Sequence, residues 1–501
     1  MVALIAEIVL ASRLKLLLFT KVCKLAIVFC ESINRETFFA KASIDRAAEL
    51  STGHATRIEP TPTSPSHQAS IRNYHRLTVL LFFLNTLSAL LFILFVNHAA
   101  YDDPYHLVDV HNYAREGVSV NSIRAHINAP GPTAYLWMAL AVRMFPGNEL
   151  RSARAAILVS WLLLGAGILA AARYTRFPSF WYAALFVTLA FPHALSATAL
   201  VLTEGPALLF ATLGALMWVE FLSLPSFNLD REPVGVAGGV LIGLAITCRQ
   251  YYLALLPTGL LFALLQWRKR SAQARSLWVV SILLSLVASI LPVLLLVAVW
   301  KGLSSPNMAS GVSYPNRIST VGANFWRPIV TTFYIALYSL PLTFPAMRHL
   351  PREQRWRTFL VAVLGGFGAV HFMSALLQPG PFNSVVGILS RTPRVQSLFF
   401  AMIVAATIYN LVAVVLLFWE KRTILFSCPP VVFSMLAIVF FVAEQFGVQG
   451  NLPFYGRYVI QLAPFLGIAA FALLPKLSML RVAVLGASSA LGQYMLWRYA
   501  F

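Results

Sequence analysis

Two groups of acidic side chains are the residues of this sequence best placed to act as bases. Asp102 and Asp103 follow a long apolar stretch, and Glu204 precedes another one, directly before Gly205 and Pro206. A charged side chain at the centre of a membrane helix costs about 2.5–3.5 kcal/mol, so an acid beside an apolar segment indicates a functional site. We predict that Asp102, Asp103 and Glu204 are catalytic, and that their chemistry is the removal of a hydroxyl proton.

The residues after Asp103 predict a short polar helix. Pro104 suits the first position of a helix, which makes Asp103 the expected N-cap and leaves Asp102 without that role. We therefore prefer Asp102 as the base. Polar side chains then recur at helical spacing on one face, and we expect them to bind substrate. These residues are His106, Asp109 and Tyr113.

A set of arginines with their polar neighbours supplies the complementary charge. Arginine binds phosphate through a planar fork of donors, so these residues indicate an anionic ligand such as phosphate. The alternative is that each arginine reaches lipid headgroups. No HExxH or GxxxxGK[ST] motif and no CxxC pair is present, so we predict no metal and no nucleotide. The predicted ligand-binding residues are Arg249, Gln250, Arg391, Arg394, Arg457 and Tyr458.

The composition shows what must position these residues. Of 501 residues, 59% are hydrophobic and only 11% are charged, against roughly 25% charged in an average soluble protein. So few charges cannot cover so much apolar surface in water, which predicts a membrane protein. The net charge of +20 then indicates basic cytoplasmic loops rather than nucleic-acid binding.

Apolar runs predict an all-α polytopic membrane protein with about thirteen spans. Placing the N-terminus inside puts the basic joints on the cytoplasmic side. Residues 132–145 are too short to span, so we expect an interfacial helix within a long first outer loop, about 99–153. The predicted spans are 77–98, 154–172, 178–199, 205–223, 233–248, 251–267, 277–300, 326–345, 358–377, 398–419, 423–444, 458–474 and 482–498. The row Gly235, Gly239 and Gly243 predicts close helix packing.

The order of these motifs resembles the GT-C class of membrane glycosyltransferases. More narrowly, it is similar to the dolichyl-phosphate-glucose α-1,2-glucosyltransferase family over residues 77 to about 474. That family has an Asp-Glu-x-Phe-His block, a Pro-Gly element, Tyr-Thr-Glu, Arg-Gln-Thr-Asn and Phe-Arg-Tyr, and here Asp103 replaces the Glu. The matching segments are Asp102 to His106, Pro130-Gly131, Leu202-Thr203-Glu204, Arg249 to Tyr252, and Gly456-Arg457-Tyr458.

We expect a three-part chain. From their composition, residues 1–76 would be a cytoplasmic extension and linker. The resemblance implies that 77–267 form a GT-C-like catalytic transmembrane module and 268–501 a second module that completes the cavity for lipid donor and acceptor. The implied reaction moves a hexose, glucose by resemblance, from a polyprenyl-phosphate sugar to a glycan, lipid or protein acceptor, with inversion and without a cofactor. The implied partners are these substrates and membrane lipids, with no nucleic acid.

Three alternatives stay open at this stage. A transporter or flippase of a lipid-linked solute would need the same apolar spans, although it would place ionisable groups nearer the membrane centre. A GT-C enzyme that transfers mannose or aminoarabinose would share the motifs. The absence of any Asn-x-Ser/Thr sequon favours a bacterial inner membrane with a periplasmic site over the endoplasmic reticulum with a lumenal site.

Overall fold

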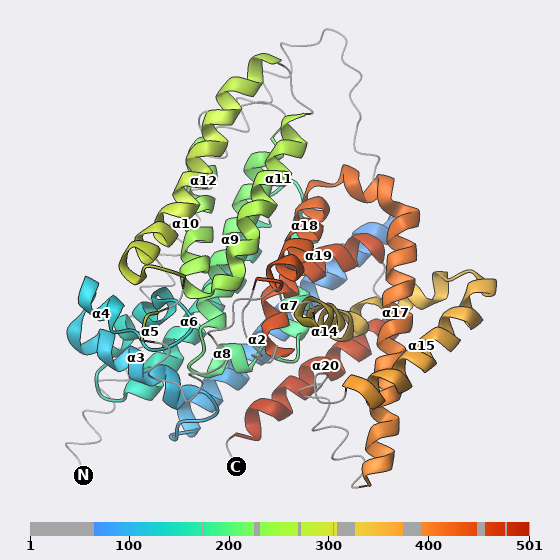
Figure 1. Ribbon diagram of the computed structural model, residues 1–501, viewed down its shortest axis with the longest axis horizontal. Helices are drawn as coiled ribbons and strands as arrows, with labels where there is room; N and C mark the ends of the chain where they lie inside the picture. The colour runs from blue at the N-terminus through green and yellow to red at the C-terminus, as the bar shows by residue number, and fades with distance from the viewer. Residues whose placement is uncertain are drawn as a thin grey trace. The chain divides into compact units, whose positions relative to one another are not determined.

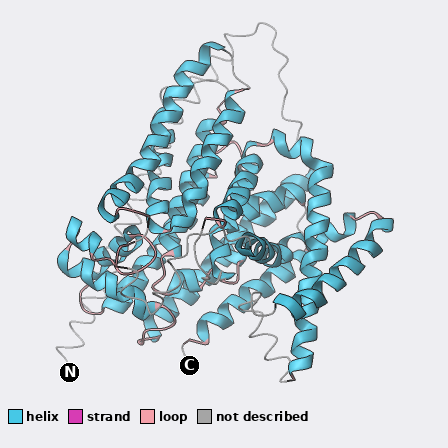
Figure 2. Ribbon diagram, viewed as in Figure 1, coloured by secondary structure: helices cyan, strands magenta, loops and turns pink. Residues whose placement is uncertain are grey.

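The computed structural model describes residues 65–172, 174–224, 231–268, 272–303, 305–307, 326–373, 392–447, 456–475 and 478–499. Within these ranges every regular element is a helix, as Figure 2 shows. The described residues from Ser66 onward form one compact unit. The predicted boundary near residue 267 therefore stays a prediction, and the predicted extension lies mostly outside the described residues.

Several helices are long and apolar enough to cross a membrane. In the described residues six meet this criterion: His75–Phe95, Glu149–Ala171, Glu204–Leu222, Trp278–Trp300, Arg327–His349 and Pro393–Ser427. Four shorter apolar helices accompany them, at Pro178–Ala190, Glu232–Cys248, Pro429–Glu444 and Arg457–Leu473. The chain is thus an all-helical, multi-pass membrane protein in its described part, while the predicted count of thirteen spans is not confirmed.

The first helix and the long loop after it set up the candidate site. Helix α2 (Pro65–Phe95) begins twelve residues before the predicted span 77–98, inside the segment predicted as a linker. The loop carries α3 (Asp103–Glu116) and α5 (Pro132–Met144) where helices are predicted, and between them a short helix, α4 (Val120–Arg124), that was not predicted. Helix α6 (Glu149–Ala171) then packs against α3 and α5.

One predicted span is broken. Residues 178–199 form α7 (Pro178–Ala190) and a one-turn helix α8 (Ser196–Ala199) rather than one continuous helix. The cause is Pro192, because the residue before a proline avoids helical geometry. Phe191 is accordingly extended, with φ −70° and ψ 136°. The irregular stretch and α8 lead to Glu204, the first residue of α9 (Glu204–Leu222).

Helices α9, α10 (Glu232–Cys248), α11 (Leu255–Trp267) and α12 (Ala272–Trp300) lie alongside one another (Figure 1). The predicted glycine row explains the close approach of α10 to α12. A Cβ on Gly239 would lie 2.2 Å from the Ser285 carbonyl oxygen, and one on Gly243 would lie 2.6 Å from that of Ser289. The predicted packing role is confirmed. The short helix η2 (Gln250–Ala254) joins α10 to α11.

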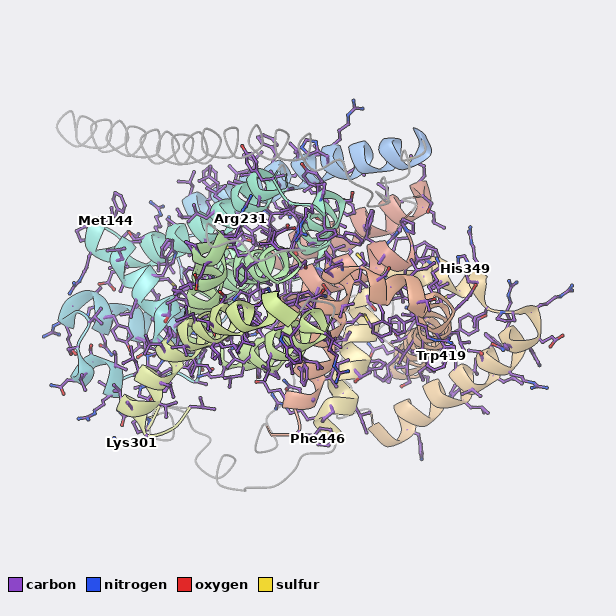
Figure 3. The ribbon with its side chains drawn as sticks, turned by 90° about the horizontal axis from the view of Figure 1, so that it is seen from above. Met144, Arg231, Lys301, His349, Trp419 and Phe446 are labelled. Atoms are coloured by element: carbon purple, nitrogen blue, oxygen red, sulfur yellow. The ribbon has the colours of Figure 1, made fainter. Side chains whose placement is uncertain are left out.

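The remaining helices complete the unit. Helices α14 and α15 both contact α17, and α18 contacts α19. Helix α17 continues through the joint predicted at Lys421 and Arg422, so the predicted span 423–444 begins only at Pro429. Seen from above, Met144 at the end of α5 and Lys301 directly after α12 lie on the same side of the view (Figure 3). These helices are α14 (Trp326–Thr343), η3 (Phe344–His349), α15 (Arg352–Met373), α17 (Pro393–Ser427), α18 (Pro429–Glu444), η4 (Gly456–Leu462), α19 (Ala463–Leu473) and α20 (Met479–Trp497).

Candidate active site

Asp102 stands at the turn between α2 and α3 and faces an arginine from the far end of the chain. Its Oδ2 accepts a hydrogen bond from Arg457 Nη1 at 2.5 Å. The Asp102 side chain is 28% exposed and that of Arg457 13%, so solutes can reach this pair. Tyr101, directly before it, has a left-handed backbone with φ 55°, and its ring lies 5.0 Å from the Arg457 guanidinium. A strained residue beside an accessible ion pair is typical of a functional site.

Asp103 has a different environment from its neighbour. It is the first residue of α3, completely buried, and its carboxylate pairs with the buried Arg154 of α6 at 2.6 Å. The same carboxylate accepts backbone N–H bonds from Ala100 at 3.0 Å and Val201 at 2.6 Å. The expectation that Asp103 is the N-cap is wrong: Asp102 holds that position, without a side-chain capping bond. Asp103 instead ties the start of α3 to α6 and to the chain before α9.

Glu204 brings two arginines together. It lies at the first position of α9, buried, and its Oε1 accepts a hydrogen bond from Arg249 Nη2. Arg457 Nε lies 3.6 Å from the same oxygen. Asp102, Glu204, Arg249 and Arg457, here called the ionic cluster, thus join positions up to 355 residues apart in the sequence. Two carboxylates and two guanidinium groups balance in charge.

An aromatic layer supports the ionic cluster. The Tyr458 ring lies 5.3 Å from the Arg249 guanidinium and 5.6 Å from that of Arg457, within cation–π range. Tyr251 packs on Tyr458, and its hydroxyl accepts a hydrogen bond from Arg327 Nη2 at 3.2 Å. Tyr458, which the sequence predicted to bind ligand, therefore lies beside the ionic cluster.

His106 lies one turn into α3 and is buried. Its Nδ1 is 2.7 Å from the Tyr135 hydroxyl of α5. Burial lowers the pKa of His106 to about 4; the nearby Arg249 and Arg457 also lower it, while Glu204 and Asp102 oppose the change. The imidazole is therefore neutral at physiological pH and adds no charge to the ionic cluster.

Asp109 and Tyr113 belong to a second, fully buried network with His126. Asp109 Oδ2 lies 3.2 Å from His126 Nδ1, and its carboxylate also accepts the backbone N–H groups of Ile127 and Asn128. The Tyr113 hydroxyl lies 3.3 Å from the same His126 nitrogen. Their side chains hold the loop before α5, so the structure does not bring these two predicted substrate ligands into the ionic cluster.

The other predicted ligands differ in position. Gln250 donates through Nε2 to the Ala129 carbonyl at 2.9 Å and to that of Leu303 at 3.1 Å, which ties the end of α10 to the loop. Arg394 is exposed in the first turn of α17. Arg391 lies outside the described residues.

Sequence reasoning missed three residues that shape the site. Arg154 carried a usable signal, because a cation inside an apolar helix needs a buried partner. Tyr101 and Tyr499 carried none, since their rings meet 5.4 Å apart only through the packing of α20. No group of three or more His, Cys, Asp or Glu side chains in the described part of the chain could hold a metal ion.

Two comparisons with known proteins gave no match: no family model matches the sequence, and no curated protein does. The structure is similar to crystal structures of ArnT from Cupriavidus metallidurans. The one bound to undecaprenyl phosphate has a TM-score of 0.37 and 17% identity over 82% of this chain and 77% of that chain. The apo structure has a TM-score of 0.36 with the same identity and coverage. At this level the chemistry has to be inferred from the ionic cluster itself.

Proposed function

We propose that this protein is a GT-C membrane glycosyltransferase that moves a hexose from a polyprenyl-phosphate sugar to a hydroxyl acceptor. The observation that carries the proposal is the ionic cluster. It combines an accessible carboxylate with two arginines, beside apolar helices long enough to cross a membrane. A base for the acceptor and cations for a phosphate leaving group are what transfer from a lipid phosphate requires.

The arginines supply the donor side of the proposal. Charge-assisted hydrogen bonds from guanidinium to phosphate are short and strong, and the fork of Arg249 or Arg457 matches a phosphate group. Glu204 holds both side chains toward one point. They would stabilise the negative charge that develops on the departing phosphate.

The proposed binding site of the isoprenoid chain is an apolar groove. It has a volume of about 500 Å³ and lies between α14, α15 and α17, with Phe333, Gly365 and Ile408 among its walls. Its first wall residues, Pro328 and Ile329, directly follow Arg327. Arg327 contacts Tyr251, and Tyr251 packs on Tyr458, so the residue next to the groove wall is linked through two aromatic side chains to the ionic cluster.

Asp102 is the proposed base. The acceptor oxygen attacks the anomeric carbon, the bond from that carbon to the phosphate oxygen breaks, and the acceptor proton passes to Asp102. One displacement inverts the anomeric centre, as in inverting glycosidases. Asp103 cannot share this task in the same way, because its carboxylate binds Arg154 and two backbone N–H groups. We assign it the role of holding the turn that presents Asp102.

The test is an Asp102→Asn variant in liposomes with undecaprenyl-phosphate glucose, made with a radiolabelled sugar, and a membrane extract as acceptor. Removal of the proton acceptor should lower the initial transfer rate about 10²–10⁴-fold at unchanged protein level. Glu149→Gln is the matched control, because Glu149 is another carboxylate of the same loop region, 44% exposed and paired with His111. Equal rates in the wild type, variant and control contradict the proposal, as does lipid movement without a glycosidic product.

A further inference from the structure

A small cavity adjoins the ionic cluster on the side of α8 and α20. Glu204 and Arg457 form part of its wall, and His193, Ser196, Ala197 and Met495 form another part. The last four come from the stretch broken at Pro192 and from the C-terminal helix, so no single motif in the sequence announces the cavity. The side chains that hold the proposed phosphate site therefore also border a second space.

Glu204, one of the residues that line this cavity, has one oxygen that accepts no hydrogen bond from the described residues. Glu204 Oε1 accepts the hydrogen bond from Arg249, whereas Glu204 Oε2 is buried and accepts none from the residues that the structure describes. The carboxylate is 1% exposed. A buried acceptor without a partner costs about 1–3 kcal/mol, so a ligand hydroxyl that donates to this atom would be favoured.

The size and lining of the cavity restrict the ligand. Its volume is about 40 Å³, which corresponds to roughly three water molecules and excludes a pyranose ring. Ala197, Ile460 and Met495 offer apolar contacts, whereas Glu204 and Ser196 offer polar ones. A group with one carbon and one hydroxyl, the hydroxymethyl arm of a hexose, satisfies both kinds of wall.

Aromatic side chains at the rim of the cavity could pack against the sugar ring that bears the hydroxymethyl group. Tyr101 and Tyr499 both border it, and their ring centroids lie 5.4 Å apart. Tyr101 is 42% exposed. His98 Nε2 lies 2.9 Å from the Tyr499 carbonyl oxygen, and Trp497 packs edge-on against Phe92, so α20 is fixed against α2 at this rim.

We propose that this cavity is a subsite for the exocyclic hydroxymethyl group of a hexose, whose hydroxyl donates to Glu204 Oε2. The inference rests on the proposed glycosyl transfer and deepens it by naming what selects the sugar. The cavity shares Glu204 and Arg457 with the proposed phosphate site. The hydroxymethyl group could therefore belong to the hexose of the donor or to that of a carbohydrate acceptor. In either case a pentose or a 6-deoxy sugar has no hydroxyl that could donate to Glu204 Oε2.

The first experiment measures binding in nanodiscs with pairs of probes that differ only in the hydroxymethyl group. The donor arm compares undecaprenyl-phosphate glucose with undecaprenyl-phosphate xylose, and the acceptor arm compares methyl β-D-glucopyranoside with methyl β-D-xylopyranoside. We expect at least a roughly 10-fold preference for the glucose probe in one arm, which identifies the source. Equal binding within both pairs overturns the proposal.

Two substitutions fill the cavity from different helices. Ala197→Val adds bulk from α8 and Met495→Phe adds it from α20, so a folding failure of one leaves the other as a test. Each should reduce binding of the preferred glucose probe to the level of its xylose counterpart and leave the xylose probe unchanged. Ala443→Val, at an exposed position of α18, is the control. A preference that persists in both folded variants contradicts the assignment.

Binding and transfer are read separately in these variants. If the preference is present and disappears on filling, but no glycosidic product forms with either donor, the cavity assignment stands and the proposed transferase activity fails. If transfer occurs at equal rates with both donors and both glycosides bind alike, the activity stands and the hydroxymethyl subsite is wrong.

Discussion

Two ion pairs on consecutive aspartates show how different neighbouring carboxylates can be. The pair of Asp103 with Arg154 is completely buried, and the Asp103 carboxylate accepts two further backbone hydrogen bonds. The pair of Asp102 with Arg457 is partly exposed, and its arginine also lies near Glu204. The carboxylate of Asp103 is fully engaged by Arg154 and the backbone, whereas Asp102 shares its arginine with Glu204.

The same difference separates structural from reactive acids elsewhere, both in the loop region and at the start of α9. Asp109 resembles Asp103: it is buried and binds His126 and backbone N–H groups of the next loop. Glu204 resembles Asp102 because both contact Arg457, and Glu204 Oε2 accepts no hydrogen bond from the described residues. Carboxylates with complete partners fix the backbone, and those with incomplete partners can exchange a partner for substrate.

The largest expected effect concerns the buried pair. Asp103→Asn removes the charge that compensates Arg154, and breaking a buried ion pair costs about 3–5 kcal/mol. We expect a large fall in thermal unfolding temperature in detergent, with any loss of transfer following the loss of folded protein. The double variant Asp103→Asn with Arg154→Met should recover part of the stability, because no buried charge is left alone. An unaltered unfolding temperature in Asp103→Asn would place that residue with the reactive acids.

The next prediction tests the link between the loop and the ionic cluster. A Cβ on Gly131 would lie 2.1 Å from the Thr247 carbonyl oxygen, in the last turn of α10 before Arg249. Gly131→Ala should therefore push the loop away from α10 and cost about 1–3 kcal/mol of stability. Gly147→Ala is the control, since nothing lies within 4 Å of its Cβ position. Equal unfolding temperatures for the two variants would contradict this contact.

A milder change addresses the shared arginine. Arg457→Lys keeps the positive charge beside Asp102 and Glu204 but loses the guanidinium fork. We expect the KM for a polyprenyl-phosphate sugar to rise about 10-fold, the loss of one charge-assisted bond of roughly 1.5 kcal/mol. Arg394→Lys, at an exposed arginine of α17, is the comparison. A larger rise in KM for Arg394→Lys than for Arg457→Lys would indicate that the phosphate binds near Arg394, which the sequence also predicted to bind ligand.

The sequence predicted the elements of the site better than its pairings. Pro104 and Pro132 correctly mark the starts of α3 and α5 because proline suits the first turn of a helix. Asp102 and Arg457 were both named, but their contact spans 355 positions and depends on how η4 packs near α9. Local signals carry no information about such a contact. The break at Pro192 was readable in the sequence, and the predicted span 178–199 overlooked it.

The smallest predicted effect lies in the pH dependence of stability. Burial lowers the pKa of His106 to about 4, while Glu204 and Asp102 oppose and Arg249 and Arg457 reinforce the shift. The unfolded chain, with a pKa near 6.5, binds a proton more readily, so this contribution to stability is complete above about pH 6.5 and declines as the pH falls toward 4. Between pH 7 and 5.5 the loss of stability should be on the order of 1 kcal/mol.

His106→Gln, which keeps a polar partner for Tyr135, should reduce the slope of unfolding temperature against pH. Burial also lowers the pKa of His126, against the opposing charge of Asp109, and that of His193, so these two histidines would account for the slope that persists. The exposed His111 provides the control variant, His111→Gln. An identical slope in wild type and His106→Gln would show that the buried imidazole has no part in the acid sensitivity of the loop region.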